Sequence, residues 1–394
     1  MCLEKPAVQV ITVAGTNGKG SCIACMEAVL EQAGYSSGVY TSPHIHDFNE
    51  RIRISRSNVS NAAVCEAFAL VEQCRQEISL SYFEFATLAA LQIFQQADLE
   101  VALLEVGLGG RLDAVNIIDP DVAIITNISL DHEDWLGSDL ESIGSEKAGI
   151  LRSKVPVVYG DCDPPASIIQ RARELAAPLY IRDQEFSYSR SDSSAAWTWQ
   201  GSDTRRQTIT FSDLSPPRMA LCNAATALQG LSLLPFELAE PDISRAFESI
   251  ELAGRFELRR DQLSAVLVVF DVAHNPAAAA MLAQNLTQFK LENPSIRSIS
   301  VVLAVLADKD IEGMVKALES CLDICYIAQV DEPRGMPVNE AASRLRKCGL
   351  QSPVIDFESV RGAYKTACAQ SADLVVVTGS FYTVAAVRKL SDAL

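Results

Sequence analysis

Short hydrophobic runs alternate with stretches of helical periodicity from the first residues of the chain. Residues 8–14 form an apolar run typical of a buried strand, a glycine-rich turn follows, and residues 21–32 suit a helix. Two further buried strands are expected at 101–106 and 122–126, because continuous runs of Val, Ile, Leu and Ala are typical of parallel sheets covered on both faces. The pattern predicts a doubly wound α/β domain.

The pattern changes in the middle of the chain. Residues 180–217 are rich in Ser, Asp, Thr and Trp with weak alternation, which favours a surface segment that carries a hairpin. An Ala-rich helix is expected over 223–234, and a second series of strands and helices begins near Val266. The strands expected in this series are 266–271, 300–305 and 374–378.

The length of 394 residues exceeds what one ordinary core holds together. We therefore predict two domains, at residues 1–256 and 257–394, joined near 255–263. The first is expected to be a mostly parallel, doubly wound sheet with a phosphate-binding loop. The second is expected to be a smaller Rossmann-like α/β domain.

Composition and charge exclude several classes of protein. A hydrophobic content of 48% with 21% charged residues is typical of a folded globular chain. The formal charge of 33 − 50 = −17 argues against a nucleic-acid-binding protein. Eleven cysteines without paired metal-type spacing indicate reduced thiols, and no apolar run approaches the ~20 residues that cross a bilayer. We expect a cytoplasmic protein without a membrane segment.

The strongest chemical signal is a glycine-rich turn between the first expected strand and the first expected helix. In that position, backbone N–H groups and the helix N-terminus bind a phosphate chain, and a lysine supplies a positive charge to its outer phosphates. A glycine separates this lysine from the following serine, which departs from the common P-loop pattern, and a turn without a ligand is the alternative. The turn consists of Gly15, Thr16, Asn17, Gly18, Lys19, Gly20 and Ser21.

Polar residues also follow other expected strands. Glu105 closes an apolar run, where a carboxylate is costly to bury unless it is paired or bound to a metal. His132 follows the strand at 122–126, and Asp271 ends the strand at 266–271. Ligands of parallel α/β sheets bind at the carboxyl ends of the strands. The alternatives are an acid that emerges at the surface for Glu105 and a solvated acidic turn for His132.

Several segments together resemble the folylpolyglutamate synthase and dihydrofolate synthase family of the Mur ligase superfamily. They occur in the order VAGTNGKGS, YTSPHIHDFNERIRI, EVGLGGRLDAVN, LDHEDWLG, SEKAGI, LAGRFE, DVAHNP, ADKDI and TGSFYTV, and they span nearly the whole chain. With SYFEFATL and DHEDWLG, the chain most resembles the bifunctional bacterial members. The family usually carries a helical segment before the first strand, and its loss is expected to weaken the folate side of the cleft.

The resemblance implies an ATP- and Mg²⁺-dependent ligase with the Mur ligase architecture. Such an enzyme adds L-glutamate to dihydropteroate and to folate polyglutamates through an acyl phosphate, and it releases ADP. Three alternatives stay open: a folylpolyglutamate synthase with that single activity, another Mur-type amino-acid ligase, and a P-loop nucleotide-binding module without catalysis. The family also implies a monomer whose partners are small molecules.

The metal ligands are implied by the resemblance. Ser42 and Glu105 would bind the Mg²⁺ that bridges the nucleotide phosphates, and Glu105 and His132 would share a second Mg²⁺. K⁺ is a further candidate cation. Lys147 is carbamylated in the family and would support the second metal, so that Lys19, His132 and Lys147 are the expected catalytic residues. A turn serine and a solvated helical lysine are the alternatives for Ser42 and Lys147.

The resemblance also implies residues for ATP. Arg255 would approach the phosphates, Asp271 would bind the ribose hydroxyls, and His274 would lie nearby. Asn223 would lie on the adenine side, although a helix N-cap is an equal alternative.

The remaining implied residues concern the pterin and glutamate. Phe83 would stack on the pterin ring and Asp113 would accept its N–H groups, beside Ala114; a core position is the alternative for Phe83. For glutamate, the resemblance indicates only the regions of Ser380 to Thr383 and Asp308 to Asp310.

Overall fold

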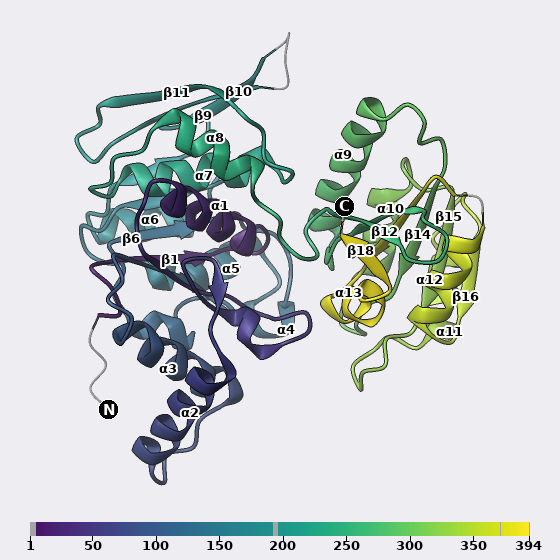
Figure 1. Cartoon of the computed structure of the whole chain (residues 1–394), viewed down its shortest axis with the longest axis horizontal. Coiled ribbons are helices and arrows are strands. Elements are labelled where there is room, and N and C mark those ends of the chain that lie inside the picture. The colour runs from purple at the N-terminus through teal and green to yellow at the C-terminus, as the bar shows by residue number, and fades with distance from the viewer. Residues whose placement is uncertain (1–4, 192–195, 371, 394) are drawn as a thin grey trace. The chain divides into compact units, whose positions relative to one another are not determined.

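The computed structural model describes residues 5–191, 196–370 and 372–393, which form two compact units (Figure 1). The units are Met1–Ile250 and Glu251–Leu394. The sequence placed the boundary between residues 256 and 257 and a linker near 255–263. In the structure, residues Glu257–Asp261 instead form a strand of the second unit.

The first unit is built on an eight-stranded sheet with the order β4-β3-β2-β5-β1-β6-β7-β8. Six strands are parallel, and β3 and β4 run antiparallel at one edge. The expected strands are confirmed with ends shifted by a residue or two. The parallel strands are β1 Gln9–Ala14, β2 Ser37–Tyr40, β5 Val101–Glu105, β6 Val122–Ile125, β7 Val157–Tyr159 and β8 Leu179–Ile181, and the edge strands are β3 Ile52–Ile54 and β4 Ser57–Asn58.

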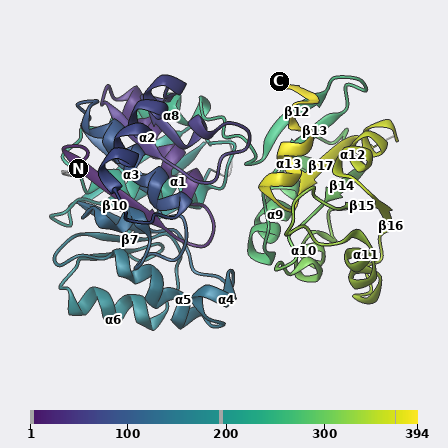
Figure 2. The same cartoon turned by 90° about the horizontal axis from the view of Figure 1, so that it is seen from below.

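Helices cover both faces of this sheet, as a doubly wound fold requires (Figures 1 and 2). One face packs against α1 Lys19–Gln32 and α7 Leu221–Ser232, and α8 Glu240–Glu248 packs on α1. The other face packs against α2 Asn61–Arg75, α3 Tyr82–Gln95, α5 Leu140–Lys147 and α6 Ala166–Glu174. The short helices are α4 Glu133–Leu136, η1 Phe48–Arg51, η2 Ala114–Ile117 and η3 Ala148–Ile150.

The segment at 180–217 contains the expected hairpin, extended to a three-stranded antiparallel sheet. Two buried tryptophans attach it to α7 and α8. The indole nitrogen of Trp199 donates to the carbonyl of Ala225 on α7 at 3.1 Å, and Trp197 packs on Phe247 of α8. Residues 192–195 of the expected segment lie outside the described residues. The strands are β9 Ser187–Arg190, β10 Trp197–Ser202 and β11 Thr208–Leu214.

The second unit contains a seven-stranded sheet with the order β16-β15-β14-β17-β13-β12-β18. Five strands are parallel, whereas β12 pairs antiparallel with both β13 and β18. The three strands expected from the sequence are β13, β14 and β17. The strands are β12 Glu257–Asp261, β13 Leu267–Phe270, β14 Ile299–Leu303, β15 Ile324–Ala328, β16 Val354–Phe357, β17 Leu374–Thr378 and β18 Ser391–Ala393.

Helices lie on both faces of the second sheet as well (Figure 1). The main hydrophobic core forms between the sheet and three helices on one face, and two helices cover the other face. Asn275 caps the first of these helices, with Pro276 as its first residue. The helices are α9 Pro276–Glu292, α10 Ile311–Leu318 and α11 Val338–Lys347 on the first face, and α12 Val360–Ala369 and α13 Phe381–Arg388 on the second.

A buried ion pair joins α1 to the edge strand β3. Arg53 donates three hydrogen bonds to Glu27, two from Nε at 3.1 Å and one from Nη2 at 2.7 Å, and the side chains are 16% and 6% exposed. Removal of one partner leaves a buried charge unpaired, whereas removal of both does not. We expect Arg53→Met to lower the free energy of unfolding by about 3 kcal/mol. The double variant Arg53→Met/Glu27→Met should recover most of this loss in urea unfolding; equal losses in both would contradict this explanation.

Candidate active site

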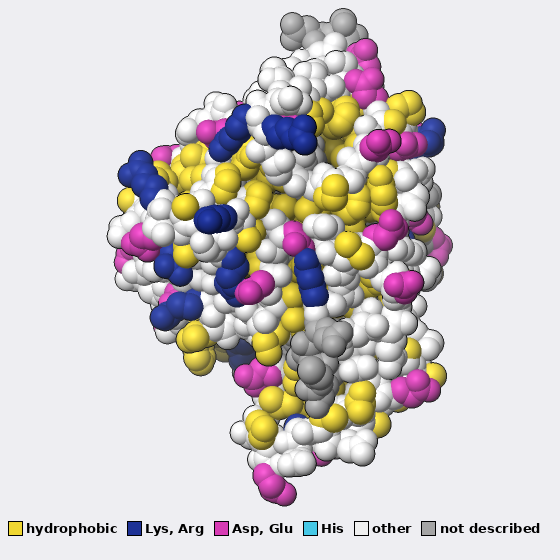
Figure 3. All heavy atoms as spheres, turned by 90° about the vertical axis from the view of Figure 1, so that its left-hand side faces the viewer, with side chains coloured by type: hydrophobic (Ala, Val, Ile, Leu, Met, Phe, Trp, Pro, Cys, Tyr) yellow, Lys and Arg dark blue, Asp and Glu magenta, His cyan; other side chains and the backbone are white. Residues whose placement is uncertain are grey.

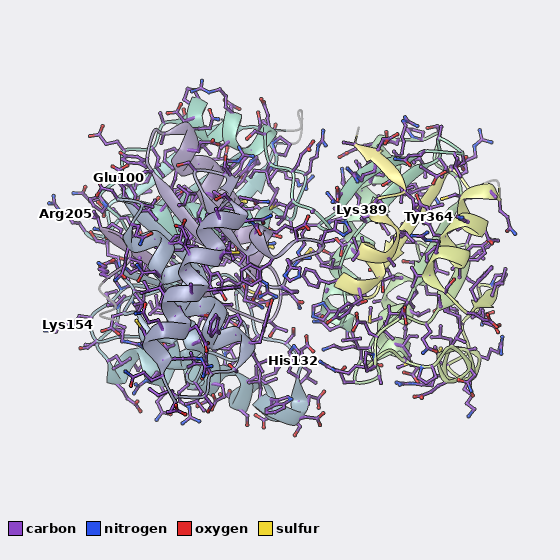
Figure 4. All side chains as sticks on the ribbon, turned by 60° about the horizontal axis from the view of Figure 1, so that its bottom comes forward. Glu100, His132, Lys154, Arg205, Tyr364 and Lys389 are labelled. Carbon is purple, nitrogen blue, oxygen red and sulfur yellow. The ribbon has the colours of Figure 1, made fainter. Side chains whose placement is uncertain are left out.

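The polar residues identified after separate strands lie at one edge of the first sheet. The strands β1, β2, β5 and β6 are parallel, so their carboxyl ends lie at the same edge. Gly15 follows β1, Ser42 follows β2, Glu105 ends β5 and His132 follows β6. Figure 4 shows Glu100, which precedes β5, on the opposite side of the unit from His132. The fold therefore brings together residues that are far apart in the sequence.

The glycine turn has a backbone that requires glycine at two positions. Gly15 has φ +145°, and a Cβ there would lie 1.8 Å from Thr126 Oγ1. Gly18 has φ +82°, and a Cβ there would lie 2.4 Å from Asn223 Oδ1. The helix α1 begins at Lys19 rather than at residue 21, so the first N–H groups of this helix belong to the turn. This is the arrangement that binds phosphate groups.

The loop after β6 holds the glycine turn in place. Thr126 Oγ1 donates to the carbonyl of Asn17 at 2.6 Å, and Asn17 N–H donates to Asn127 Oδ1 at 2.9 Å. Thr16 Oγ1 accepts from Ser129 N–H at 3.0 Å. The sequence interpretation did not identify these residues. The signal in the sequence that could have identified them is the group of polar residues directly after the strand at 122–125.

Two lysines converge on the same carbonyl of the turn. Lys19 Nζ donates to the carbonyl of Gly15 at 3.0 Å and to that of Thr16 at 3.2 Å. Lys147, at the end of α5, donates to the carbonyl of Gly15 at 3.1 Å. Lys147 is buried, so it is not the solvated helical lysine that its sequence context would suggest. The two ammonium groups concentrate positive charge at the turn.

Burial and the charge of Lys19 lower the pKa of Lys147 to about 7, against the attraction of Asp131 and Asp113. The ordinary pKa of a lysine is 10.5. Between pH 7 and pH 10.5 the Lys147 amine is therefore mostly protonated in the unfolded chain and mostly neutral in the folded chain. Unfolding then takes up a proton, and the stability contributed by this residue rises as pH increases from about 7 toward 10.

We therefore expect a pH-dependent difference between the wild-type chain and Lys147→Met. In CO₂-free buffer, the unfolding free energy of the wild type should increase relative to that of the variant by up to ~1.4 kcal/mol per pH unit between pH 7 and 10. Urea unfolding at several pH values measures this difference. A difference that stays constant with pH would show that Lys147 has an ordinary pKa.

Glu105 is a buried carboxylate at the carboxyl end of β5. Its Oε2 atom accepts from the backbone N–H of Ser42 at 3.0 Å, and a Cβ on Gly20 would lie 3.9 Å from the same atom. The carboxylate thus faces the first turn of α1 and stands beside Ser42. Carboxylate and hydroxyl oxygens are ligands that Mg²⁺ prefers. The two residues therefore suit a hard divalent cation next to a phosphate chain.

His132 occupies the position before α4 and has a left-handed backbone, with φ 53° and ψ 40°. Asp131 is buried and accepts from the N–H of His132 at 2.9 Å, whereas Glu133 and Asp134 are exposed. The turn is therefore only partly solvated. In the described part of the chain, no three His, Cys, Asp or Glu side chains are arranged as a metal site. Any metal here would use other donors as well, such as Ser42, phosphate oxygens or a modified Lys147.

The residues expected to bind a pterin lie near the turn. Phe83, on α3, stacks on Tyr40 with ring centroids 5.9 Å apart, and a Cβ on Gly107 would meet its ring at 2.6 Å. Burial raises the pKa of Asp113, although Leu108 N–H and Val115 N–H both donate to its carboxylate and Lys19 attracts it. Phe83 and Asp113 thus flank the loop after β5. Ala114 begins η2 directly after Asp113.

Asn223 is not a helix N-cap. The helix α7 begins at Leu221 with Ala220 before it, and Asn223 lies in its first turn. The helix starts earlier than predicted because the run from Leu221 is already buried against the sheet. The Asn223 side chain reaches Gly18 of the glycine turn.

The second unit places Asp271 and His274 after β13. The carboxylate of Asp271 accepts from Phe256 N–H and Ala273 N–H, each at 2.9 Å, and its burial raises its pKa in spite of Arg255. Arg255 lies over the ring of Phe381 at 5.0 Å. His274 Nδ1 lies 2.9 Å from the carbonyl oxygen of Val272.

The residues suggested for glutamate lie at the carboxyl edge of the second sheet. Ser380 and Thr383 are buried, and their hydroxyl oxygens are 2.6 Å apart. Thr383 Oγ1 donates to the carbonyl of Ala304 at 2.6 Å. In the loop after β14, Lys309 is buried and pairs with Asp308 at 3.2 Å. The two hydroxyls thus fix the start of α13 beside this loop.

Among the described helices, none is both long enough and apolar enough to span a bilayer. Figure 3 shows one face of the first unit, on which Lys and Arg side chains are interspersed with Asp, Glu and hydrophobic side chains.

The chain is similar to known proteins over almost its whole length. Residues 13–212 match the Mur ligase middle domain, and residues 254–381 match the Mur ligase glutamate ligase domain. The dihydrofolate synthase/folylpolyglutamate synthase of Escherichia coli is 42% identical over 99% of this chain and 88% of its own length.

Solved structures extend the similarity to the fold. Escherichia coli FolC in complex with DHPP and ADP matches with a TM-score of 0.89 over 98% of this chain and 89% of that one. A Yersinia pestis bifunctional folylpolyglutamate synthase/dihydrofolate synthase complexed with AMPPNP and Mn ion is 43% identical, with a TM-score of 0.87 over 98% of this chain and 90% of that one.

Proposed function

The chain belongs to the dihydrofolate synthase/folylpolyglutamate synthase family of Mur ligases, and from this premise we propose that it is bifunctional. It would use ATP and a divalent cation to join L-glutamate to dihydropteroate and to folates, with release of ADP and phosphate. The single observation that carries this proposal is the convergence of Lys19, Lys147 and Glu105 on the glycine turn.

The turn would bind the ATP phosphates through its backbone N–H groups, with Lys19 next to the transferred phosphoryl group. An oxygen of the acceptor carboxylate attacks the γ-phosphorus, and the bond to the ADP oxygen breaks. The amine of glutamate then attacks the carbonyl carbon of the acyl phosphate. The amide forms, phosphate leaves with the acceptor oxygen, and the amine loses a proton. The positive charge of Lys19 stabilises negative charge in both steps.

Ser42, Glu105 and His132 would hold divalent cations at this edge, with Mg²⁺ at two positions, and K⁺ as a further cation. The support is the pairing of Ser42 with the Glu105 carboxylate beside α1. A bound cation would neutralise phosphate charge during transfer.

Lys147 would be carbamylated, so that its amine becomes an anionic oxygen ligand. The neutral amine attacks CO₂, a C–N bond forms, and one proton is released. A lowered pKa favours this reaction, because only the neutral amine is nucleophilic. Among the remaining residues, Phe83, Asp113 and Ala114 would bind the pterin, and Asn223, Arg255, Asp271 and His274 would contribute to ATP binding.

The decisive experiment measures ADP release with Mg²⁺, ATP and L-glutamate, and offers dihydropteroate and tetrahydrofolate in separate reactions. Activity with both acceptors is the expected result. Activity with tetrahydrofolate alone would indicate a folylpolyglutamate synthase with that single activity. Turnover with neither acceptor but with a UDP-linked acid would indicate another Mur-type ligase, and ATP binding without any amide product would indicate a nucleotide-binding module.

We further propose that the enzyme acts as a monomer in the cytoplasm. The described cysteines are all free thiols, which supports a reducing compartment. Its other partners would be small molecules only.

A further inference from the structure

A buried arginine outside the phosphate and metal residues has no protein anion as its partner. Arg51, the last residue of η1, is 7% exposed. Within residues 5–191, 196–370 and 372–393, no Asp or Glu carboxylate forms an ion pair with its guanidinium. Arginine is rarely buried unless it is paired. By contrast, Arg53, two residues later, has its carboxylate partner in Glu27.

The surroundings of Arg51 fix its guanidinium and leave its ends available. Its Nε–H donates to His44 Nδ1 at 2.8 Å. The rings of Phe48 and Tyr82 lie beside it, with centroids 5.9 and 5.6 Å from Cζ. Among the described residues, no protein atom accepts a hydrogen bond from either terminal nitrogen, and neither nitrogen is fully buried. Both nitrogens therefore reach solvent. We refer to Arg51, His44, Phe48 and Tyr82 as the arginine box.

The arginine box adjoins residues of both the metal group and the pterin group. The carbonyl of Arg51 accepts from Thr41 N–H at 2.9 Å, and Thr41 precedes Ser42. Tyr82 precedes Phe83, whose ring stacks on Tyr40. The positive charge of Arg51 also opposes the rise in the pKa of Tyr40 that burial causes, so the guanidinium lies near the ring on which Phe83 stacks.

We propose that Arg51 binds the α-carboxylate of the glutamyl residue in folate acceptors. The inference rests on the proposed function, in which two acceptors are used. Dihydropteroate carries a single carboxylate, which the reaction consumes, whereas a folate carries an α-carboxylate in addition to the reacting γ-carboxylate. A guanidinium with two free ends matches a carboxylate through paired hydrogen bonds, and the flanking rings strengthen these bonds by excluding water. Arg51 is thus a specificity residue for the folate acceptor.

The test compares kcat/KM for tetrahydrofolate and dihydropteroate in the full-length wild-type enzyme and in Arg51→Gln. The ratio of the two values should fall by about tenfold or more in the variant, through a higher KM for tetrahydrofolate, because a charge-assisted hydrogen bond pair is lost. Arg75→Gln, which removes a half-buried arginine of α2 that pairs with Glu72, is the matched control and should keep the wild-type ratio. Arg51→Lys should restore only part of the ratio, because lysine lacks the fork.

A second measurement on the wild-type enzyme keeps the proposal testable if Arg51→Gln does not fold. The substrate is tetrahydrofolate whose α-carboxylate is replaced by a carboxamide. The kcat/KM of the wild-type enzyme for this amide should be about as low as the kcat/KM of Arg51→Gln for tetrahydrofolate. The proposal is overturned if the wild-type kcat/KM for the amide equals that for tetrahydrofolate. It is also overturned if Arg51→Gln lowers kcat/KM by the same factor for both acceptors. Failure of the proposed function would be distinct, since the wild type would then form no amide with either acceptor.

Discussion

Replacement of Lys19 with alanine is expected to lower kcat for both acceptors by at least about a thousandfold. Lys19 Nζ is held by the carbonyls of Gly15 and Thr16, so its charge is fixed at the turn before any ligand binds. Phosphoryl transfer depends mainly on positioning and charge neutralisation, and alanine supplies neither. Steady-state ADP release with each acceptor measures the effect.

Lys365→Ala is the matched control, because Lys365 is an exposed lysine on α12. It should keep wild-type activity, and both variants should unfold at a urea concentration close to that of the wild type. Turnover of Lys19→Ala within tenfold of the wild type would remove Lys19 from the mechanism.

Replacement of Glu105 with glutamine is expected to lower kcat by a similar factor, about a thousandfold, with both acceptors. The amide keeps the shape of the side chain and can still accept from Ser42 N–H, but it lacks the charge that holds a divalent cation. The amide has nearly the volume of the carboxylate, so the metal-free variant should unfold at a urea concentration close to that of the metal-free wild type. ADP release and urea unfolding in EDTA measure these two quantities.

Glu66→Gln, at an exposed position of α2, serves as the control and should leave activity intact. Two results would count against a metal role for Glu105: activity of Glu105→Gln near that of the wild type, or a loss of activity fully explained by unfolding.

Most of the fold could be predicted because local pattern and tertiary structure agree. The apolar runs at residues 101–106 and 122–126 have the composition of strands covered on both faces, and they occupy the centre of the first sheet. The boundary between the units was harder, because the charged strand Glu257–Asp261 has the composition of a linker. In the structure it pairs with β13 and with β18, which lies at the far end of the second unit's sequence.

The site was predictable where a residue type carries its own physical signal. Glu105 at the end of an apolar strand and Lys19 in a glycine turn are both unusual in their local sequence. Lys147 and Ser42 are ordinary in theirs, and only the family resemblance identified them. The burial of Lys147 depends on the packing of α5 beside the turn, which no local pattern encodes.

Two further groups were missed for the same reason. The loop from Thr126 to Ser129 holds the glycine turn through contacts across more than a hundred residues of sequence. Arg51 and Arg53 are alternate residues of one short segment, yet only Arg53 meets a carboxylate. Whether a charge is paired is decided by tertiary structure, so the sequence could not distinguish the two.

The central claim is that the glycine turn and Glu105 promote transfer of a phosphoryl group from ATP to the acceptor carboxylate. Dihydropteroate labelled with ¹⁸O in its carboxylate tests this directly in a reaction with ATP, Mg²⁺ and L-glutamate. Mass spectrometry of the released phosphate should find one carboxylate oxygen transferred to phosphate in each turnover. Formation of the amide with no label in the phosphate would contradict the account.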